Sequence, residues 1–214
     1  SYVVMDVIAD INSSTGGAAS TDTITVGLGT VNYQGGLSKA PASVTAQVAS
    51  GATFTIHKTS MAIANLALTS APTLTDGAIV GQFNVTAGSS GDVILKTVSI
   101  SQAGSLIQAS SSVVLNVYGS DAPTTLLGTA TAVGSTNIYA VTLNTTNGWT
   151  VAKGTTQYLI VKANLGSATG LVTTTGSYTY QINAQTATWN DGVTNGIGIN
   201  PIIATPINGQ VSNF

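Results

Sequence analysis

Apolar and polar residues alternate along most of the chain with the period of two that is typical of half-buried β-strands. In residues 1–11, five apolar side chains lie on one face of the predicted strand, namely Val3, Met5, Val7, Ala9 and Ile11. The same alternation recurs over residues 23–33, 54–59, 96–101, 158–165 and 178–184. The segment 61–68 is also compatible with a short helix, but its Thr- and Ser-rich flanks favour a strand. The pattern therefore predicts an all-β protein.

Turn sequences separate the predicted strands. They are Asp76-Gly77, Asp121-Ala122-Pro123, Asn147-Gly148, Asp191-Gly192, Asn195-Gly196 and Asn208-Gly209. Such dipeptides provide the positive-φ positions that tight turns require. Roughly a dozen strands at spacings of about 8–12 residues are typical of a sandwich or barrel. We predict an antiparallel β-sandwich of Ig-like or jelly-roll type over residues 23–214, preceded by an N-terminal strand and linker over residues 1–22.

The composition excludes several classes of function. The 214 residues include five lysines, seven aspartates and one histidine, with no arginine, glutamate or cysteine. Charged residues make up 6% of the chain, against about 25% in a typical soluble domain. The groups on which most enzymes depend are almost absent, and no basic cluster exists to neutralise phosphates. No apolar run approaches the ~20 residues of a membrane-spanning helix. We therefore expect neither an enzyme, nor a nucleic-acid-binding protein, nor a membrane-inserted protein.

The scarcity of charge also bears on the surface of the protein. Mixed surface charge normally keeps β-rich proteins apart, and here the polar surface must consist of Ser, Thr, Asn, Gln and backbone. Such a surface suits a protein that is covered by identical neighbours, by glycans, or by both. The chain begins at Ser1 rather than Met, so we expect a processed form, made either by removal of an export signal or by trimming for expression. We predict an extracellular or cell-surface location.

From about Val44 onward the chain resembles exported Ig-like or jelly-roll surface modules of bacteria and archaea. The resemblance lies in residues 81–88 (GQFNVTAG), 91–98 (GDVILKTV), 113–118 (VVLNVY), 127–130 (LGTA), 149–163 (WTVAKGTTQYLIVKA) and 188–192 (TWNDG). Such modules resemble the subunits of extracellular filaments and surface layers, including the TasA-like fibre proteins. The resemblance covers about three quarters of the chain and implies a β-sandwich with no catalytic residues.

The N-terminal segment is the candidate functional site. Its apolar row of Val3, Met5, Val7, Ala9 and Ile11 is followed by a Ser/Gly-rich stretch, so the segment can add itself as a strand to the sheet of another subunit. A head-to-tail contact of this kind builds a filament unless its rotation closes a ring. The alternative is that residues 1–11 pair within their own domain. The run 199–214 is a second candidate donor.

Other candidate sites receive less support from the sequence. His57 is the only imidazole, lies in a predicted strand and lacks the setting of a catalytic triad. Oxygen ligands for a structural calcium ion could come from strand ends, namely Asp10, Asn12, Asp92, Asp121, Asn190 and Asp191. Turn-stabilising hydrogen bonds are the preferred role of these residues, and we expect no cofactor. Trp149 and Trp189 are interpreted as caps of the core, with carbohydrate stacking as the alternative.

Three Asn-x-Ser/Thr sequences, at Asn12, Asn84 and Asn144, are candidate N-glycosylation sites. Their occupancy depends on whether the source glycosylates its exported proteins.

The favoured function is that of a structural subunit of an extracellular, pilus-like filament, a homopolymer joined by N-terminal strand donation. The alternative is a monomeric adhesin or carbohydrate-binding module of a cell-surface protein.

Overall fold

The computed structural model describes residues 8, 10, 22–69, 76–104, 113–132, 137–164, 177–192, 207–209 and 212–213. Throughout these residues the protein is all-β and contains no helix, and every strand pair is antiparallel. The chain divides into two compact units, Ser1–Lys58 and Thr59–Phe214.

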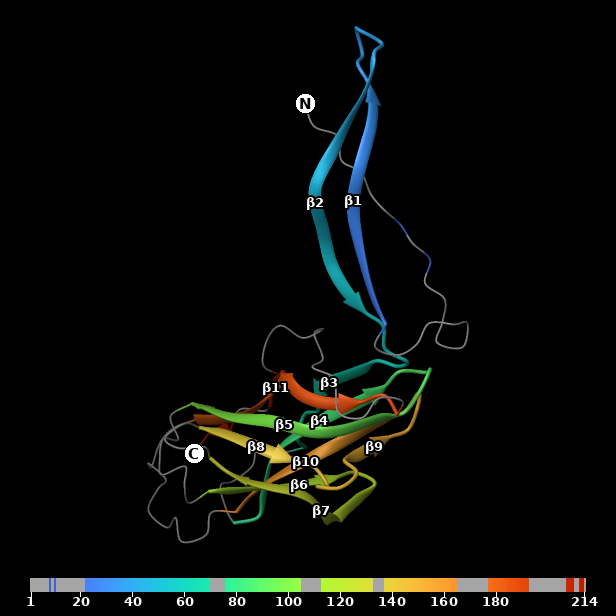
Figure 1. The fold of residues 1–214 in the computed structure, drawn as a ribbon. Coiled ribbons are helices and arrows are strands. Elements are labelled where there is room, and N and C mark those ends of the chain that lie inside the picture. Colours follow the sequence, from blue (N-terminus) through green and yellow to red (C-terminus); the bar gives the residue numbers. More distant parts are fainter. Residues whose placement is uncertain are drawn as a thin grey trace. The chain divides into compact units, whose positions relative to one another are not determined.

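The first unit contains a β-hairpin (Figure 1). It consists of β1 (Thr23–Gln34) and β2 (Pro41–Thr55), which form a two-stranded sheet of their own. The predicted strand at residues 23–33 is thus confirmed. The predicted sandwich over residues 23–214 included this region, whereas the hairpin belongs to neither sandwich sheet. The predicted division after residue 22 stays a prediction.

The second unit is a β-sandwich of two sheets (Figure 1). The first sheet has five strands in the order β3 (Met61–Asn65), β4 (Ala78–Ala87), β10 (Thr156–Asn164), β6 (Val114–Gly119) and β7 (Ala122–Thr131). The second has the order β12 (Ile207–Asn208), β11 (Ser177–Asn190), β5 (Val93–Gly104) and β8 (Ile138–Thr142), with β9 (Trp149–Val151) paired to β5 and β13 (Ser212–Asn213) paired to β11. This arrangement confirms the predicted antiparallel sandwich, and β3 confirms that residues 61–65 form a strand.

The alternating pattern explains the core. On β10, Leu159, Val161 and Ala163 are fully buried, as the period of two predicts. Ile160 points to the opposite face and is nevertheless buried, since β10 is a central strand and Ile160 lies between Gln82 and Tyr118 of its neighbours. The two sheets supply the core with fully buried side chains that include Phe83, Val85, Leu115, Ile100, Tyr139, Val141, Tyr180 and Ile182.

Three of the predicted turns contain a glycine with positive φ. Gly77, Gly148 and Gly192 have φ angles of 76°, 76° and 80°, and each follows the Asp or Asn that marked the turn in the sequence. Residues with a Cβ atom rarely adopt this conformation, whereas glycine adopts it without steric cost, which explains why glycine occupies these three positions.

One side of the sandwich is closed by contact between the edge strands of the two sheets. Tyr139, the second residue of β8, forms an antiparallel β-bridge with Ala132, which follows β7. The Asn144 N–H donates a hydrogen bond to the Leu127 carbonyl at 2.7 Å. A Cβ atom on Gly128 would collide with the Thr142 carbonyl. Glycine at this position therefore lets the two edge strands approach each other.

Candidate self-assembly surface

The predicted donor residues Val3, Met5, Val7, Ala9 and Ile11 lie outside the described residues, as does Asn12. Ile8 and Asp10 are the described residues of this segment. Neither belongs to a strand, and the Ile8 side chain is 89% exposed.

The hairpin exposes large apolar side chains along both strands. Val26, Leu28, Tyr33, Val44 and Phe54 are each more than 40% exposed. Every residue of the described hydrophobic core belongs instead to the second unit. An isolated two-stranded hairpin is only marginally stable in water, and independent stability requires a third strand or a packing partner. Among the described residues the hairpin therefore combines exposed apolar side chains with the minimum number of strands, which makes it a candidate for association.

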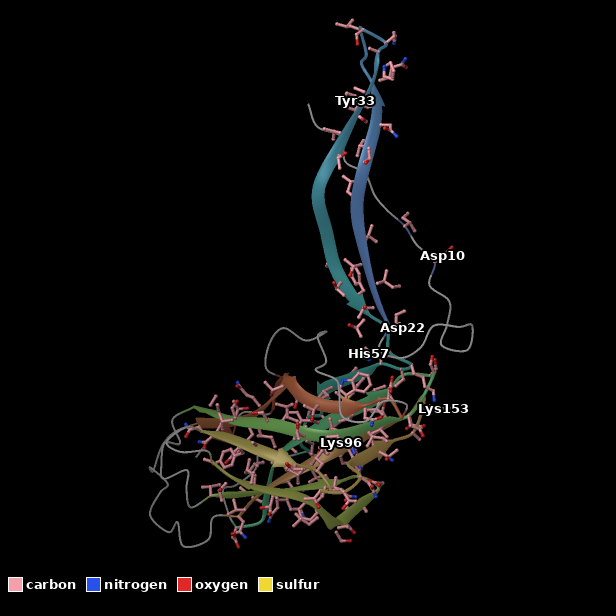
Figure 2. The ribbon with its side chains drawn as sticks, viewed as in Figure 1. Asp10, Asp22, Tyr33, His57, Lys96 and Lys153 are labelled. Atoms are coloured by element: carbon pink, nitrogen blue, oxygen red, sulfur yellow. The ribbon has the colours of Figure 1, made fainter. Side chains whose placement is uncertain are left out.

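Hydrogen bonds at the two ends of the hairpin fix its pairing. At the open end, the Ile56 N–H donates to the Asp22 carbonyl at 2.8 Å, and at the turn end the Lys39 N–H donates to the Gly35 carbonyl at 2.9 Å. Between them the Thr25 and Thr53 hydroxyls are hydrogen-bonded at 2.7 Å. Figure 2 shows Tyr33 toward the turn end, and Asp22 and His57 at the open end. His57 is half-buried and follows β2, so the prediction that it lies within a strand is wrong.

The two strands of the hairpin differ in regularity. The register of the pairing shifts at two places. From the pair Thr25–Thr53 to the pair Gly27–Ser50, the chain passes two residues along β1 but three along β2. From Leu28–Ala49 to Thr30–Thr45, it passes two residues along β1 but four along β2. The extra residues of both bulges are thus on β2. Extra residues bend a strand and leave backbone groups unpaired, so the outer edge of β2 is irregular.

On one side of the sandwich, both sheets end in short strands among the described residues. Within the described part of the chain, β3 pairs with β4 alone, and β12 and β13 each pair two residues with β11. β3 and β12, the end strands of the two sheets, are in contact. A strand added on this side would continue either sheet.

The two described sequons differ in accessibility. Asn84 lies in β4 between Ala64 of β3 and Tyr158 of β10, and its side chain is half-buried. Asn144 is exposed in the turn after β8 and has a φ of 42°. Of these two, Asn144 is the residue whose surroundings leave room for a glycan.

Three of the residues proposed as calcium ligands, Asp92, Asp121 and Asn190, accept hydrogen bonds within the sandwich. Asp92 accepts from the Lys153 N–H at 2.8 Å, and Asp121 accepts from the Trp149 indole N–H at 2.9 Å. The Asn190 side chain accepts from the Gly192 N–H at 2.5 Å. Across the described ranges, no three His, Cys, Asp or Glu side chains converge as metal ligands would.

Both tryptophans are buried. Trp149 and Trp189 are 3% exposed and belong to the core, so neither ring presents a face on which a sugar could stack. Near the turn end of the hairpin, a hollow of about 340 Å³ is lined by Asn32, Tyr33, Pro41, Ala42 and Ser43. Tyr33 is 55% exposed there.

The sequence contains features that mark β1 as a further candidate for association, beside the N-terminal segment. Residues 23–38 contain no charged side chain, and Gly27 and Gly29 interrupt an otherwise strand-like pattern. In the sequence, β1 can therefore be identified by three features that occur together: alternating apolar residues, the absence of charged residues and glycines within the strand.

Comparison with known proteins provides no functional relative. No protein-family model and no curated protein matches the sequence. One similar solved structure is that of AvmM, described as catalysing macrocyclization in alchivemycin A biosynthesis. It matches 73% of this chain and 86% of its own, with a TM-score of 0.33 and 9% sequence identity. Similarity at this level carries no implication for function. No helix in the described ranges is long and apolar enough to cross a membrane.

Proposed function

We propose that the protein is the structural subunit of an extracellular filament, joined by donation of the N-terminal strand to the sheet of a neighbouring subunit. The observation that carries the proposal is the contrast between the two units. The second unit contains all of the described hydrophobic core, whereas the first exposes its apolar side chains. Apolar surface that a chain leaves uncovered marks a site of association.

The described residues of the N-terminal segment support this role. Ile8 is 89% exposed, and neither Ile8 nor Asp10 belongs to a strand. In the proposed junction the row Val3, Met5, Val7, Ala9 and Ile11 faces the neighbour's core. Each aliphatic side chain that becomes buried contributes ~1.5–3 kcal/mol before ordering costs, so the junction is expected to be stable.

The sandwich provides a suitable acceptor. Its end strand β3 has five residues, and β12 and β13 have two each. Within the described part of the chain β3 pairs with β4 alone, and pairing of an added strand along such a sheet edge is the basis of β-strand addition. The acceptor in this proposal is the side of the sandwich where β3 and β12 meet.

The charge-poor surface supports repeated packing of identical subunits. Only five lysines and seven aspartates are available to repel a neighbour, and nearby groups engage several of them. The Lys96 ammonium donates to the Asn147 carbonyl at 2.8 Å, and that of Lys162 lies 4.6 Å from the centre of the Tyr118 ring. The surface thus favours neutral, main-chain-driven contacts over charge-steered binding.

The test combines electron microscopy with a matched pair of substitutions. Val7→Lys places a charge in the donor row, and Ile8→Lys places the same charge on the opposite face of the segment. We expect native protein and Ile8→Lys to form fibres with a regular repeat at neutral pH, and Val7→Lys to remain as single subunits. Fibres of normal appearance from Val7→Lys would refute strand donation by this segment.

One observation favours the alternative of a monomeric adhesin or carbohydrate-binding module. The hollow at Tyr33 combines an exposed aromatic ring with the polar side chains of Asn32 and Ser43, a combination that sugar-binding surfaces use. Native protein that remains monomeric, and that binds an oligosaccharide measurably by calorimetry unless Tyr33→Ala is introduced, would support this function in place of the filament.

A further inference from the structure

The hairpin lacks a third strand among the described residues. β1 pairs with β2 alone, although three or more strands, or a packed partner, are needed for independent stability. The two outer edges of the hairpin are therefore the places where a further strand can be added.

The two edges are not equally prepared for pairing. The outer edge of β2 begins with Pro41, which has no N–H to donate, and contains the extra residues of both bulges. Prolines and bulges are devices that prevent strand addition. β1 contains no proline, no charged residue and no extra residue. Only β1 therefore presents an unprotected edge.

The backbone orientation near the open end of β1 follows from one hydrogen bond. The Ile56 N–H donates to the Asp22 carbonyl, so Asp22 and Ile56 form a hydrogen-bonded pair. Bonded and non-bonded pairs alternate along an antiparallel ladder, which makes Thr25–Thr53 a non-bonded pair. The N–H groups of Thr25 and Thr53 consequently point away from each other, toward the outer edges of β1 and β2.

The glycines of β1 are consistent with a close neighbour. A Cβ atom on Gly27 or Gly29 would meet nothing within 4 Å, and neither residue has a positive φ. Neither crowding within the chain nor backbone conformation therefore requires glycine at these positions. Because a Cβ atom points out of the plane of the sheet, whereas an added strand lies within that plane, these glycines leave the edge of β1 open to main-chain pairing.

We propose that β1 pairs edge to edge with β1 of a second copy of the chain, antiparallel about a two-fold axis normal to the sheet. The product is a four-stranded sheet in the order β2–β1–β1–β2. This contact goes beyond strand donation by residues 1–11 and does not depend on it. It is isologous and closed, so each subunit gains one such neighbour.

The side chains of β1 favour a second copy of the chain as the partner at its outer edge. A two-fold axis normal to the sheet keeps each side-chain row beside its own symmetry copy. The apolar row of Ile24, Val26 and Leu28 therefore lies beside the same three residues, and the opposite row, with Thr23 and Thr25, lies beside its own threonines. Pairs of these kinds are favourable across strands. A charged partner has little to recognise, because Lys39 is the only charged residue between positions 23 and 56.

Cysteine scanning tests the pairing in the full chain, which has no cysteine of its own. Single cysteines are placed at each position from 24 to 32 on β1, with Val44→Cys and Phe54→Cys on β2 as controls. After mild oxidation, covalent dimers are measured on a denaturing, non-reducing gel. Directly opposed residues have Cα atoms about 4.5–5.5 Å apart, within the range of a disulfide, whereas a shift of one residue takes them beyond it. We expect dimers at a single β1 position, the one at the two-fold axis, at least tenfold above the β2 controls.

A matched pair of prolines tests the edge itself. Thr25→Pro removes an N–H from the outer edge of β1, and Thr53→Pro removes one from the outer edge of β2. Both substitutions abolish the same Thr25–Thr53 hydrogen bond and leave the hairpin ladder donors in place. Introduced into the best cross-linking variant, Thr25→Pro is expected to reduce dimer formation at least tenfold, and Thr53→Pro to change it less than twofold.

Several results would overturn the proposal. Equal cross-linking from β1 and β2, absence of dimers from every β1 position, or equal effects of the two prolines would each contradict it. Dimers that appear only when residues 1–11 are deleted would mean that this segment occupies the β1 edge instead. Fibres without β1 cross-links would leave strand donation intact and refute the β1 contact, and β1 dimers without fibres would do the reverse.

Discussion

The hairpin and the sandwich are built from the same kinds of residue in the same alternating pattern, and they differ in what covers the apolar row. On β10, Leu159, Val161 and Ala163 face a second sheet and are fully buried. On β1, Val26 and Leu28 follow the same alternation and are 42% and 45% exposed. An identical local signal thus leads to a folded core where a second layer exists, and to a surface suited to association where none does.

The largest expected effect contrasts two phenylalanines. Phe83→Ala removes a fully buried ring from the sandwich core and should lower the free energy of unfolding by about 3–5 kcal/mol. Phe54→Ala removes a ring that is 63% exposed on the hairpin and should change it by less than about 0.5 kcal/mol. Denaturant titration followed by tryptophan fluorescence measures the sandwich, because Trp149 and Trp189 lie there, and amide hydrogen exchange measures the hairpin. Equal losses would refute the contrast.

Two glycines provide the next comparison. Gly128→Ala forces a methyl group against the Thr142 carbonyl and to within 2.9 Å of the Val141 Cγ1, so it should destabilise the sandwich by about 1–3 kcal/mol. Gly27→Ala enters open space and should stabilise the hairpin by about 0.5–1 kcal/mol, since glycine is unfavourable inside a strand. Amide hydrogen exchange reports each unit separately. Slower exchange in the hairpin of Gly27→Ala, beside faster exchange in the sandwich of Gly128→Ala, is the expected result.

The bond between Trp149 and Asp121 is expected to make a moderate contribution. Asp121→Ala leaves the buried indole N–H without its acceptor and should lower the free energy of unfolding by about 1–2 kcal/mol. The expected loss is smaller than for a fully buried hydrogen bond to a charged group, because Asp121 is exposed to solvent. Asp121→Asn keeps an acceptor oxygen and should cost less than half as much. Thermal unfolding of the two variants side by side measures the difference; equal losses would mean that the bond does not stabilise the sandwich.

The smallest effect concerns Tyr139, whose hydroxyl is buried without a hydrogen-bond partner among the described residues. Tyr139→Phe removes this polar group and should raise the free energy of unfolding by about 1 kcal/mol. Burial also raises the pKa of Tyr139 above its ordinary value of 10.0. The unfolded chain then releases this proton at lower pH than the folded one, so stability falls as the pH rises above about 10. Above about pH 10 the free energy of unfolding of Tyr139→Phe should fall less with pH than that of the native protein. An equal fall in both proteins would show that Tyr139 does not cause the loss of stability at alkaline pH.

The fold could be predicted from the sequence where a local pattern determines the structure. The alternation in residues 159–163 and the Asp-Gly and Asn-Gly turns specify strands and reversals through their own backbone preferences. The separate sheet of β1 and β2 could not be predicted, because alternation identifies an apolar face but not what lies against it. The bond between Asp121 and Trp149 joins residues 28 positions apart, and only the folded sandwich brings them together. On the candidate assembly surface, the sequence identified the apolar N-terminal row but not the difference between the edges of β1 and β2, which depends on the bulges.

The turn of the hairpin has a consequence for proteolysis. Lys39 is exposed in this turn with a φ of 52°, and it is the only lysine or arginine between positions 23 and 57. Trypsin therefore has one target within the hairpin, at the bond that follows Lys39. Cleavage there leaves β1 and β2 on separate fragments, and because a two-stranded ladder alone is only marginally stable, a free nicked subunit is expected to release its N-terminal fragment, whereas a subunit whose hairpin is covered by a partner keeps both pieces.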